Sequence, residues 1–321
     1  MSSRNLKIVY MGSAGFAVPA LEKLVGAGYG ILYVVTQPDK ARGRGGRVLP
    51  TPVGLCAEKW GLRTLKPESL SGNDEFVRTL AEAGPDLVVV AAYGKILPKA
   101  VLKIPSLGCV NIHASLLPEY RGAAPVQRAI LDGRRETGVT LMYMAEGLDS
   151  GDIISSDKVE ILTKDAGELT EVLAGLGAGL LLQEMPRIAD GTAPRVRQDE
   201  TKATYAEKIE KAEGLLDFGR RAEEIALRVR AMTPAPGAYV LKDEKRIGVI
   251  KALAIDPDSA GEAYKAYNEA APGAVLDVSR QGIVVRAGEG AVVIEAVKMP
   301  GRKAMPVAEY LKGNVFTEKS L

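Results

Sequence analysis

The stretch "DLVVVAAY" (residues 86–93) is a nearly unbroken apolar run in a chain of 321 residues. Such a run is typical of a strand that is covered on both faces, as strands of parallel sheets are. Further strands are predicted at 6–11 ("LKIVYM"), 31–37 ("ILYVVTQ"), 62–67 ("LRTLKP") and 108–114 ("GCVNIHA"). Helical patterns alternate with the early strands, so we predict an α/β fold with a doubly wound, mostly parallel Rossmann-like sheet.

The pattern changes in the second half of the chain. A long amphipathic helix is predicted over 166–191, and the following residues are polar and aperiodic. After a helix at 221–232, short apolar runs separated by turn residues indicate a small β-barrel, for which the OB type is one candidate. We therefore predict a catalytic domain at 1–191, a linker at 192–213 and a smaller OB-like domain at 214–321.

Composition restricts the functional classes. Hydrophobic residues make up 46% of the chain and charged residues 26%, and the net charge of +2 is too small for a general nucleic-acid binder. Cys56 and Cys109 lack metal-ligand spacing, so we expect no metal site. No apolar run is long enough to cross a membrane, and the first strand begins near Leu6. We expect a cytoplasmic protein that does not bind membranes.

The chain has a single histidine, His113, at the end of a predicted central strand. Alternate side chains of a strand share a face, so Asn111, His113 and Ser115 point the same way. Open α/β sheets bind ligands at the carboxyl ends of their strands. A hydrogen-bonded core histidine is the alternative, but burying three polar groups together without a function is costly. This pattern favours a ligand site.

Other motifs exclude or leave open specific chemistries. The early loop "GSAG" (12–15) lacks the dinucleotide-binding pattern, and "HASLL" (113–117) lacks the nucleophile elbow of serine hydrolases. "AEGLDSGDIISS" (145–156) supplies Asp149 and Asp152 in a glycine-flanked loop. Either aspartate could reach His113, and an ordinary turn would have the same sequence. The sequence alone does not choose between them.

The stretch "QPDKARGRGGRVLPTP" (37–52) concentrates positive charge. Four basic residues and three glycines precede Val48, against one acidic residue, Asp39. The segment is either a phosphate-contacting arm or a solvated loop, and composition favours neither. Without an apolar residue before Val48, we expect residues 38–47 to lack order in the absence of a partner.

Several of these stretches together resemble the folate-dependent formyltransferases. "NIHASLLPEYRGAAP" (111–125) with "GLDSGDI" (147–153) is similar to the family's catalytic motifs, and residues 37–53 are similar to its inserted basic loop. "APGAVLDVSRQGIVV" (271–285) and "GRKAMPVAEYL" (301–311) are similar to an OB-like C-terminal domain. The resemblance covers essentially the whole chain.

The resemblance implies a role for each matching residue. The catalytic set would be Asn111, His113 and Asp149. The folate site would be lined by Ser115, Leu116, Leu117 and Pro118. The residues that contact tRNA would be Lys40, Arg42, Arg44 and Arg47.

The resemblance also implies the reaction. The formyl group of 10-formyltetrahydrofolate, a co-substrate, would pass to the α-amino group of initiator methionyl-tRNA, giving N-formylmethionyl-tRNA for translation initiation. His113 would be an electrophilic catalyst, and Asp149 would hold it cationic or accept the amine proton. We expect a monomer. The alternatives are a formyltransferase with another acceptor, such as glycinamide ribonucleotide or a nucleotide sugar, a hydrolase that releases formate, and an RNA-binding module without activity.

Overall fold

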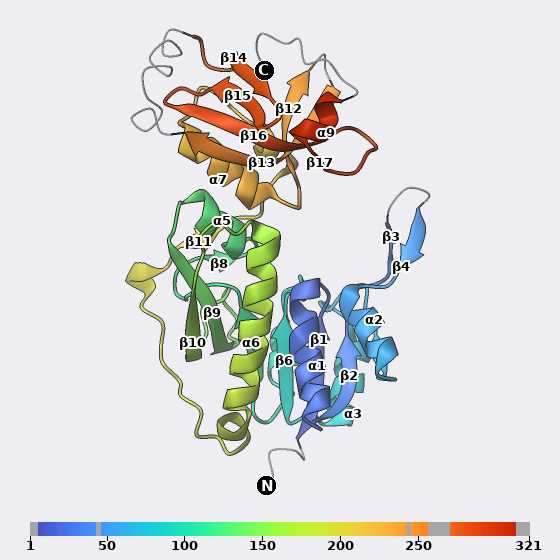
Figure 1. Ribbon diagram of the computed structural model, residues 1–321. Helices are drawn as coiled ribbons and strands as arrows, with labels where there is room; N and C mark the ends of the chain where they lie inside the picture. The colour runs from blue at the N-terminus through green and yellow to red at the C-terminus, as the bar shows by residue number, and fades with distance from the viewer. Residues whose placement is uncertain (1–5, 43–45, 243–244, 256–269, 313–321) are drawn as a thin grey trace. The chain divides into compact units, whose positions relative to one another are not determined.

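The computed structural model describes residues 6–42, 46–242, 245–255 and 270–312 (Figure 1). Its contacts divide the chain into two compact units. The first comprises Met1–Pro125, Glu136–Glu160 and Thr170–Glu207, and the second comprises Val126–Arg135, Ile161–Leu169 and Lys208–Leu321. Residues 192–207 thus group with the first unit. The functional division at 1–191, 192–213 and 214–321 stays a prediction.

A seven-stranded sheet forms the centre of the first unit, in the order β10-β9-β7-β6-β1-β2-β5. The five strands from β7 to β5 are parallel to one another, whereas β9 pairs antiparallel with both β7 and the edge strand β10. The predicted mostly parallel α/β fold is confirmed. The strands span Lys7–Gly12 (β1), Gly30–Val35 (β2), Thr64–Leu65 (β5), Leu87–Ala91 (β6), Cys109–His113 (β7), Glu136–Tyr143 (β9) and Ile153–Glu160 (β10).

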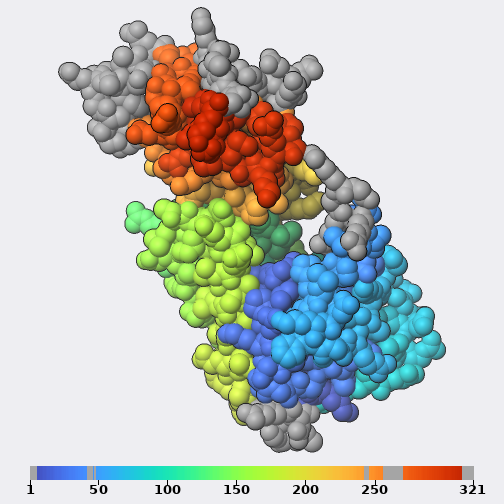
Figure 2. Space-filling model, turned by 45° about the vertical axis from the view of Figure 1, so that its right-hand side comes forward, coloured from blue at the N-terminus to red at the C-terminus, as the bar shows by residue number. Residues whose placement is uncertain are grey.

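Helices cover both faces of this sheet. Helices α1 (Val18–Gly26), α2 (Pro52–Lys59) and α6 (Ala166–Ala189) lie on one face, where α1 and α2 are side by side and Lys59 Nζ is 3.1 Å from Glu22 Oε1 (Figures 1 and 2). On the other face, α3 (Asp74–Ala83) and α4 (Lys99–Leu102) pack on the buried side chains of β1, β6 and β7. The continuous apolar runs of the central strands follow from this double cover.

Local sequence explains where these helices begin and end. Thr51 caps α2, because its side chain accepts a hydrogen bond from the backbone N–H of Gly54, and Pro52 occupies the first helical position. Asn73 caps α3 in the same way. Gly84 ends α3 in a left-handed conformation with φ +58°.

Two strand pairs were not expected from the sequence. Strand β10 forms a hairpin with β9, although five of its eight residues are polar and four are exposed. Within the basic stretch, β3 (Lys40–Arg42) pairs with β4 (Arg47–Leu49). Our expectation that 38–47 lacks order is therefore wrong for the paired residues, whose backbone hydrogen bonds need no apolar core. Residues 43–45 lie outside the described part.

The second unit is built on an antiparallel sheet in the order β12-β13-β16-β15-β14, with β17 beside β16. Helix α7 (Ala222–Met232) buries Ile225, Val229 and Met232, three to four residues apart, in the same apolar cluster as the strands. The separate β domain predicted from the sequence is thus present. Its other elements are α5 (Pro125–Leu131), which begins at the last residue of the first unit, β12 (Ala238–Lys242), β13 (Lys245–Ile255), β14 (Val275–Ser279), β15 (Gly282–Arg286), β16 (Ala291–Lys298), β17 (Met305–Pro306) and α9 (Val307–Leu311).

Cys56 and Cys109 are buried, and neither forms a disulfide. Burial raises the pKa of the Cys109 thiol to about 12, so this thiol stays protonated at neutral pH. Among the described helices, none combines the length and the apolar character needed to cross a membrane.

The contact between α6 and the sheet requires a glycine. A Cβ added at Gly177 would lie 2.6 Å from Ile112 Cγ2 and 3.0 Å from Val139 Cγ2, whereas a Cβ at Gly175 would meet nothing within 4 Å. We expect Gly177→Ala to destabilise the protein by about 1–3 kcal/mol through overpacking. Gly175→Ala should stabilise it by about 0.5–1 kcal/mol through helix propensity. Thermal melts of the two variants test this, and equal shifts would contradict the packing at Gly177.

Candidate active site

Strand β7 places Asn111 and His113 on one face of the sheet, as the alternation of its residues predicts. The two side chains are only 8% and 6% exposed. Their cross-strand partners on β9 are Met142 and Thr140. The amide of Asn111 has no hydrogen-bond partner among the residues that the structure describes, so a donor and an acceptor of this largely buried residue remain available to a ligand at this end of the strand.

Hydrogen bonds from buried side chains stabilise the loop that follows β7. The Ser115 hydroxyl donates to the carbonyl of Glu119 over 2.6 Å, and Ser115 is completely buried. The Thr140 hydroxyl donates to the carbonyl of Ser115 and accepts from the N–H of Leu117. The peptide between Leu117 and Pro118 is cis. Ser115 and Leu117 thus shape the loop, while Leu116 and Pro118 are half-buried at its edge. The prediction that these four residues line a folate site stays a prediction.

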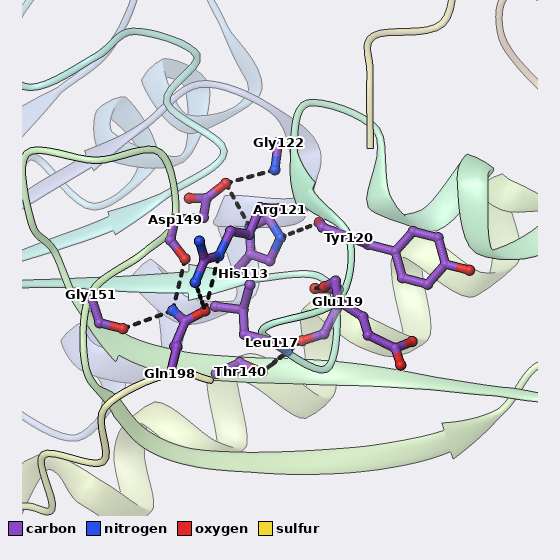
Figure 3. Close-up of polar contacts among 11 residues, drawn as sticks. His113, Leu117, Glu119, Tyr120, Arg121, Gly122, Thr140, Asp149, Gly151 and Gln198 are labelled. Carbon is purple, nitrogen blue, oxygen red and sulfur yellow. Dashed lines mark hydrogen bonds and ion pairs between the residues drawn. The ribbon is translucent and has the colours of Figure 1, made fainter. Parts of the chain in front are cut away.

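His113 lies between two acceptors (Figure 3). Its Nε2 is 2.9 Å from the carbonyl of Tyr120, and its Nδ1 is 3.6 Å from Asp149 Oδ2. A carbonyl oxygen can only accept, so Nε2 carries a proton in this contact. The Nδ1 contact is within ion-pair range but longer than a hydrogen bond. Nδ1 is therefore the nitrogen that remains available for chemistry.

The structure places Asp149 beside His113, which the sequence could not decide. Asp149 has a left-handed backbone, with φ +47°, and its Oδ2 accepts a hydrogen bond of 2.9 Å from the N–H of Gly122. Asp152 instead lines a pocket of about 390 Å³ together with Tyr143, Arg195 and Arg197. The carboxylate of Asp149 is thus fixed toward the imidazole by a backbone donor.

A buried network lies next to this site and was not predicted from the sequence. Arg121 is only 2% exposed, and its guanidinium donates to Gln198 Oε1 and to the carboxylate of Glu200. The hydrogen bond from Arg121 lowers the pKa of the Glu200 carboxyl group below its usual value. Gln198 in turn donates to the backbone carbonyls of Asp149 and Gly151 (Figure 3). Gln198 and Glu200 lie in the segment that we predicted as a linker, where a polar sequence carried no signal of burial.

Three of the four predicted tRNA-contacting residues, Lys40, Arg42 and Arg47, belong to the β3–β4 hairpin that follows β2. Lys40 is exposed, and its Nζ is 3.4 Å from Gln37 Oε1. Arg42 and Arg47 are paired across the hairpin ladder. Arg44 lies outside the described residues. The hairpin therefore brings at least two basic positions together, and their role stays a prediction.

The sequence profile of the formyl transferase family matches residues 6–183, a range that contains Asn111, His113 and Asp149. The chain belongs to the formyl transferase family. A second profile of this family, described as the formyl transferase C-terminal domain, matches residues 208–315.

Relatives of similar length support this assignment. Methionyl-tRNA formyltransferase of Moorella thermoacetica is 43% identical over 309 residues, which cover 96% of each chain. The enzyme of the same name from Clostridioides difficile is 40% identical over 97% of this chain and 98% of the relative. The similarity therefore spans both units.

Solved structures of formyl transferases share the fold. A sugar 3N-formyl transferase, WlaRD, solved with dTDP and 5-N-formyl-THF, has a TM-score of 0.65 at 18% identity, covering 93% of this chain and 99% of that one. HypX from Aquifex aeolicus in complex with tetrahydrofolic acid has a TM-score of 0.64 at 18% identity, covering 96% of this chain and 47% of HypX. At this identity the likeness concerns the fold alone.

Proposed function

We propose that this enzyme transfers the formyl group of 10-formyltetrahydrofolate to the α-amino group of methionyl-tRNA. The observation that carries the proposal is the amide of Asn111, a largely buried residue beside His113, to which no described residue forms a hydrogen bond, in a chain about 40% identical to methionyl-tRNA formyltransferases over nearly its whole length. We extend the proposal to the initiator tRNA as acceptor, to a monomeric state and to the cytoplasm. The test is formyl transfer to charged initiator and elongator tRNAs, with formate release measured in parallel.

The proposed mechanism assigns a task to each polar group. The amine attacks the formyl carbon, and the carbonyl oxygen becomes an oxyanion that needs donors already in place. The Asn111 amide and Nδ1–H of His113 are the donors on that face of β7. The N–C bond to the folate then breaks, and its nitrogen takes up a proton.

Asp149 would accept the proton that the attacking amine loses. An α-amino group has a pKa of roughly 7.7–8.0 in model compounds, so part of it is neutral and nucleophilic at pH 7. The amine must still lose a proton as the new bond forms, and the Asp149 carboxylate is the acceptor beside His113. Its charge would also stabilise the imidazolium form of His113. The apolar edge of Leu116 and Pro118 would contact the folate, and no part of this scheme requires a metal.

Removing the donors should reduce turnover without unfolding the protein. We expect Asn111→Ala and His113→Ala each to lower kcat by roughly 10²–10⁴-fold, because each removes a group that acts on the developing oxyanion. Asn111→Ala should leave the melting temperature nearly unchanged, since none of the described residues loses a hydrogen bond when this amide is removed. Kinetics and thermal melts check this, and activity lost only in step with stability would identify the two residues as structural.

The charge of Asp149 should matter more than its shape. Asp149→Asn keeps an oxygen for the N–H of Gly122 but removes the charge, so we expect kcat to fall by roughly 10²-fold or more. The KM for the folate should change little. Asp152→Asn is the matched control from the same loop, and a reversed order of the two effects would overturn the assignment of Asp149.

We further propose that the β3–β4 hairpin contacts the phosphates of the tRNA acceptor arm. Each contact releases a counterion, so log affinity should fall with log salt by about 0.7–0.9 per contact. Replacing the four basic residues with Gln should raise the KM for methionyl-tRNA and flatten the salt dependence, with Arg42 contributing most. The four are Lys40, Arg42, Arg44 and Arg47.

A control variant that loses the same number of positive charges distinguishes tRNA binding at the hairpin from a general electrostatic attraction between tRNA and the protein. Four exposed basic residues of α1, α2, α3 and β10 can be changed to Gln together: Lys23, Lys59, Arg78 and Lys158. The salt slope of tRNA binding should stay unchanged in this control. An unchanged slope in the hairpin variant would instead show that the RNA path lies elsewhere.

A further inference from the structure

A short segment from Gln198 to Ala206, which we call the strap, lies against the loop that follows β7. Its strand β11 (Tyr205–Ala206) pairs in parallel with β8 (Arg121–Gly122). The N–H of Arg121 donates to the carbonyl of Thr204 over 2.9 Å, and the N–H of Ala123 donates to the carbonyl of Ala206 over 2.9 Å. The strap thus follows the loop from residue 118 to residue 124.

Thr204 of the strap fixes the residue that binds His113 Nε2. Tyr120 has a left-handed backbone, with φ +58°. Its N–H donates to the Thr204 hydroxyl over 2.8 Å, and its carbonyl faces Nε2 of His113 over 2.9 Å. The direction of that carbonyl depends on the unusual backbone of Tyr120. Thr204 holds this backbone by its side-chain hydrogen bond to Tyr120 and by two backbone hydrogen bonds, to Pro118 and Arg121.

Gln198 of the strap fixes the residue that faces His113 Nδ1. Its amide nitrogen donates to the carbonyls of Asp149 and Gly151, each over 2.8 Å. Its amide oxygen accepts from Nε and a terminal nitrogen of Arg121, over 3.0 and 2.8 Å. Gln198 is only 5% exposed. Every hydrogen-bonding direction of the amide nitrogen is used, and no carboxylate could replace it, because a carboxylate cannot donate to two carbonyls.

We infer that Gln198 and Thr204 are positioning residues that set the orientation of the His113 imidazole from two sides. Gln198 acts through Asp149 on Nδ1, and Thr204 acts through Tyr120 on Nε2. Neither residue forms a hydrogen bond with the imidazole itself. The kinetic part of this inference rests on the proposed function, whereas the orientation of the ring can be measured without activity.

The single histidine makes that measurement direct, because ¹⁵N-labelled histidine gives one pair of ring-nitrogen NMR signals for the full-length protein. We expect Gln198→Glu to shift the Nδ1 signal and to leave Nε2 nearly unchanged. Thr204→Val, which removes only the acceptor of the Tyr120 N–H, should shift the Nε2 signal first. Thr204→Ser keeps the hydroxyl and should restore the signals of the natural protein.

Kinetics provide the second readout. A displacement of about 1 Å at a catalytic group can cost about 10²-fold in rate, so we expect Gln198→Glu to lower kcat by roughly 10–100-fold and Thr204→Val by less. The KM for the folate should stay within about twofold. Asp199→Asn is the matched control, because its Oδ1 can still accept from the N–H and hydroxyl of Thr201, and it should change neither kcat nor the ring signals.

The outcomes separate the two proposals. Unchanged ring signals in folded Gln198→Glu and Thr204→Val would overturn the inference. It would also be overturned if the Asp199→Asn control shifted both ring-nitrogen signals as much as these variants do. If Gln198→Glu does not fold, Thr204→Val with its Ser counterpart decides the question alone. Absence of formyl transfer by the natural protein would overturn the proposed function, and the ring signals would still test the strap.

Discussion

The contact between His113 Nε2 and the Tyr120 carbonyl is the constraint from which the rest of the site follows. It fixes a proton on Nε2 and turns Nδ1 toward Asp149. To meet the ring from both sides, Tyr120 and Asp149 both take left-handed backbones that non-glycine residues avoid at a cost of about 1–3 kcal/mol each. Such conformations persist only where surrounding hydrogen bonds determine them, and here those bonds come from Gly122, Thr204 and Gln198.

The structure could be predicted from the sequence where the pattern of apolar residues along the chain matches the pattern of burial. The apolar runs of the central strands reflect helices on both faces, so their strand character could be read without tertiary information. The period of two in β7 placed Asn111 and His113 on one face, and the structure has them there. The caps of α3, Asn73 and Gly84, are residue types that favour the two ends of a helix through local conformation alone.

The sequence was uninformative where hydrogen bonds between distant residues determine the structure. Choosing between Asp149 and Asp152 requires the turn conformation, which depends on the N–H of Gly122, 27 residues away. The strap is polar and has no apolar period, because its stability comes from bonds to residues about 80 positions earlier, such as Arg121. The β3–β4 ladder likewise involves exposed residues, so no pattern of burial could indicate it.

The strap also bears on where one module of this protein ends and the next begins. The formyl transferase profile ends at residue 183 and its C-terminal counterpart begins at 208, which leaves the strap between them. A boundary drawn after α6 would keep the whole sheet and every side chain around His113, yet it would discard Gln198 and Thr204. Suppose that this sheet were joined to a different C-terminal domain. The hydrogen bonds that Gln198 and Thr204 form around His113 would then be kept only if the junction came after Ala206. The residues that determine the surroundings of His113 therefore extend past the sheet and its helices to the end of the first compact unit.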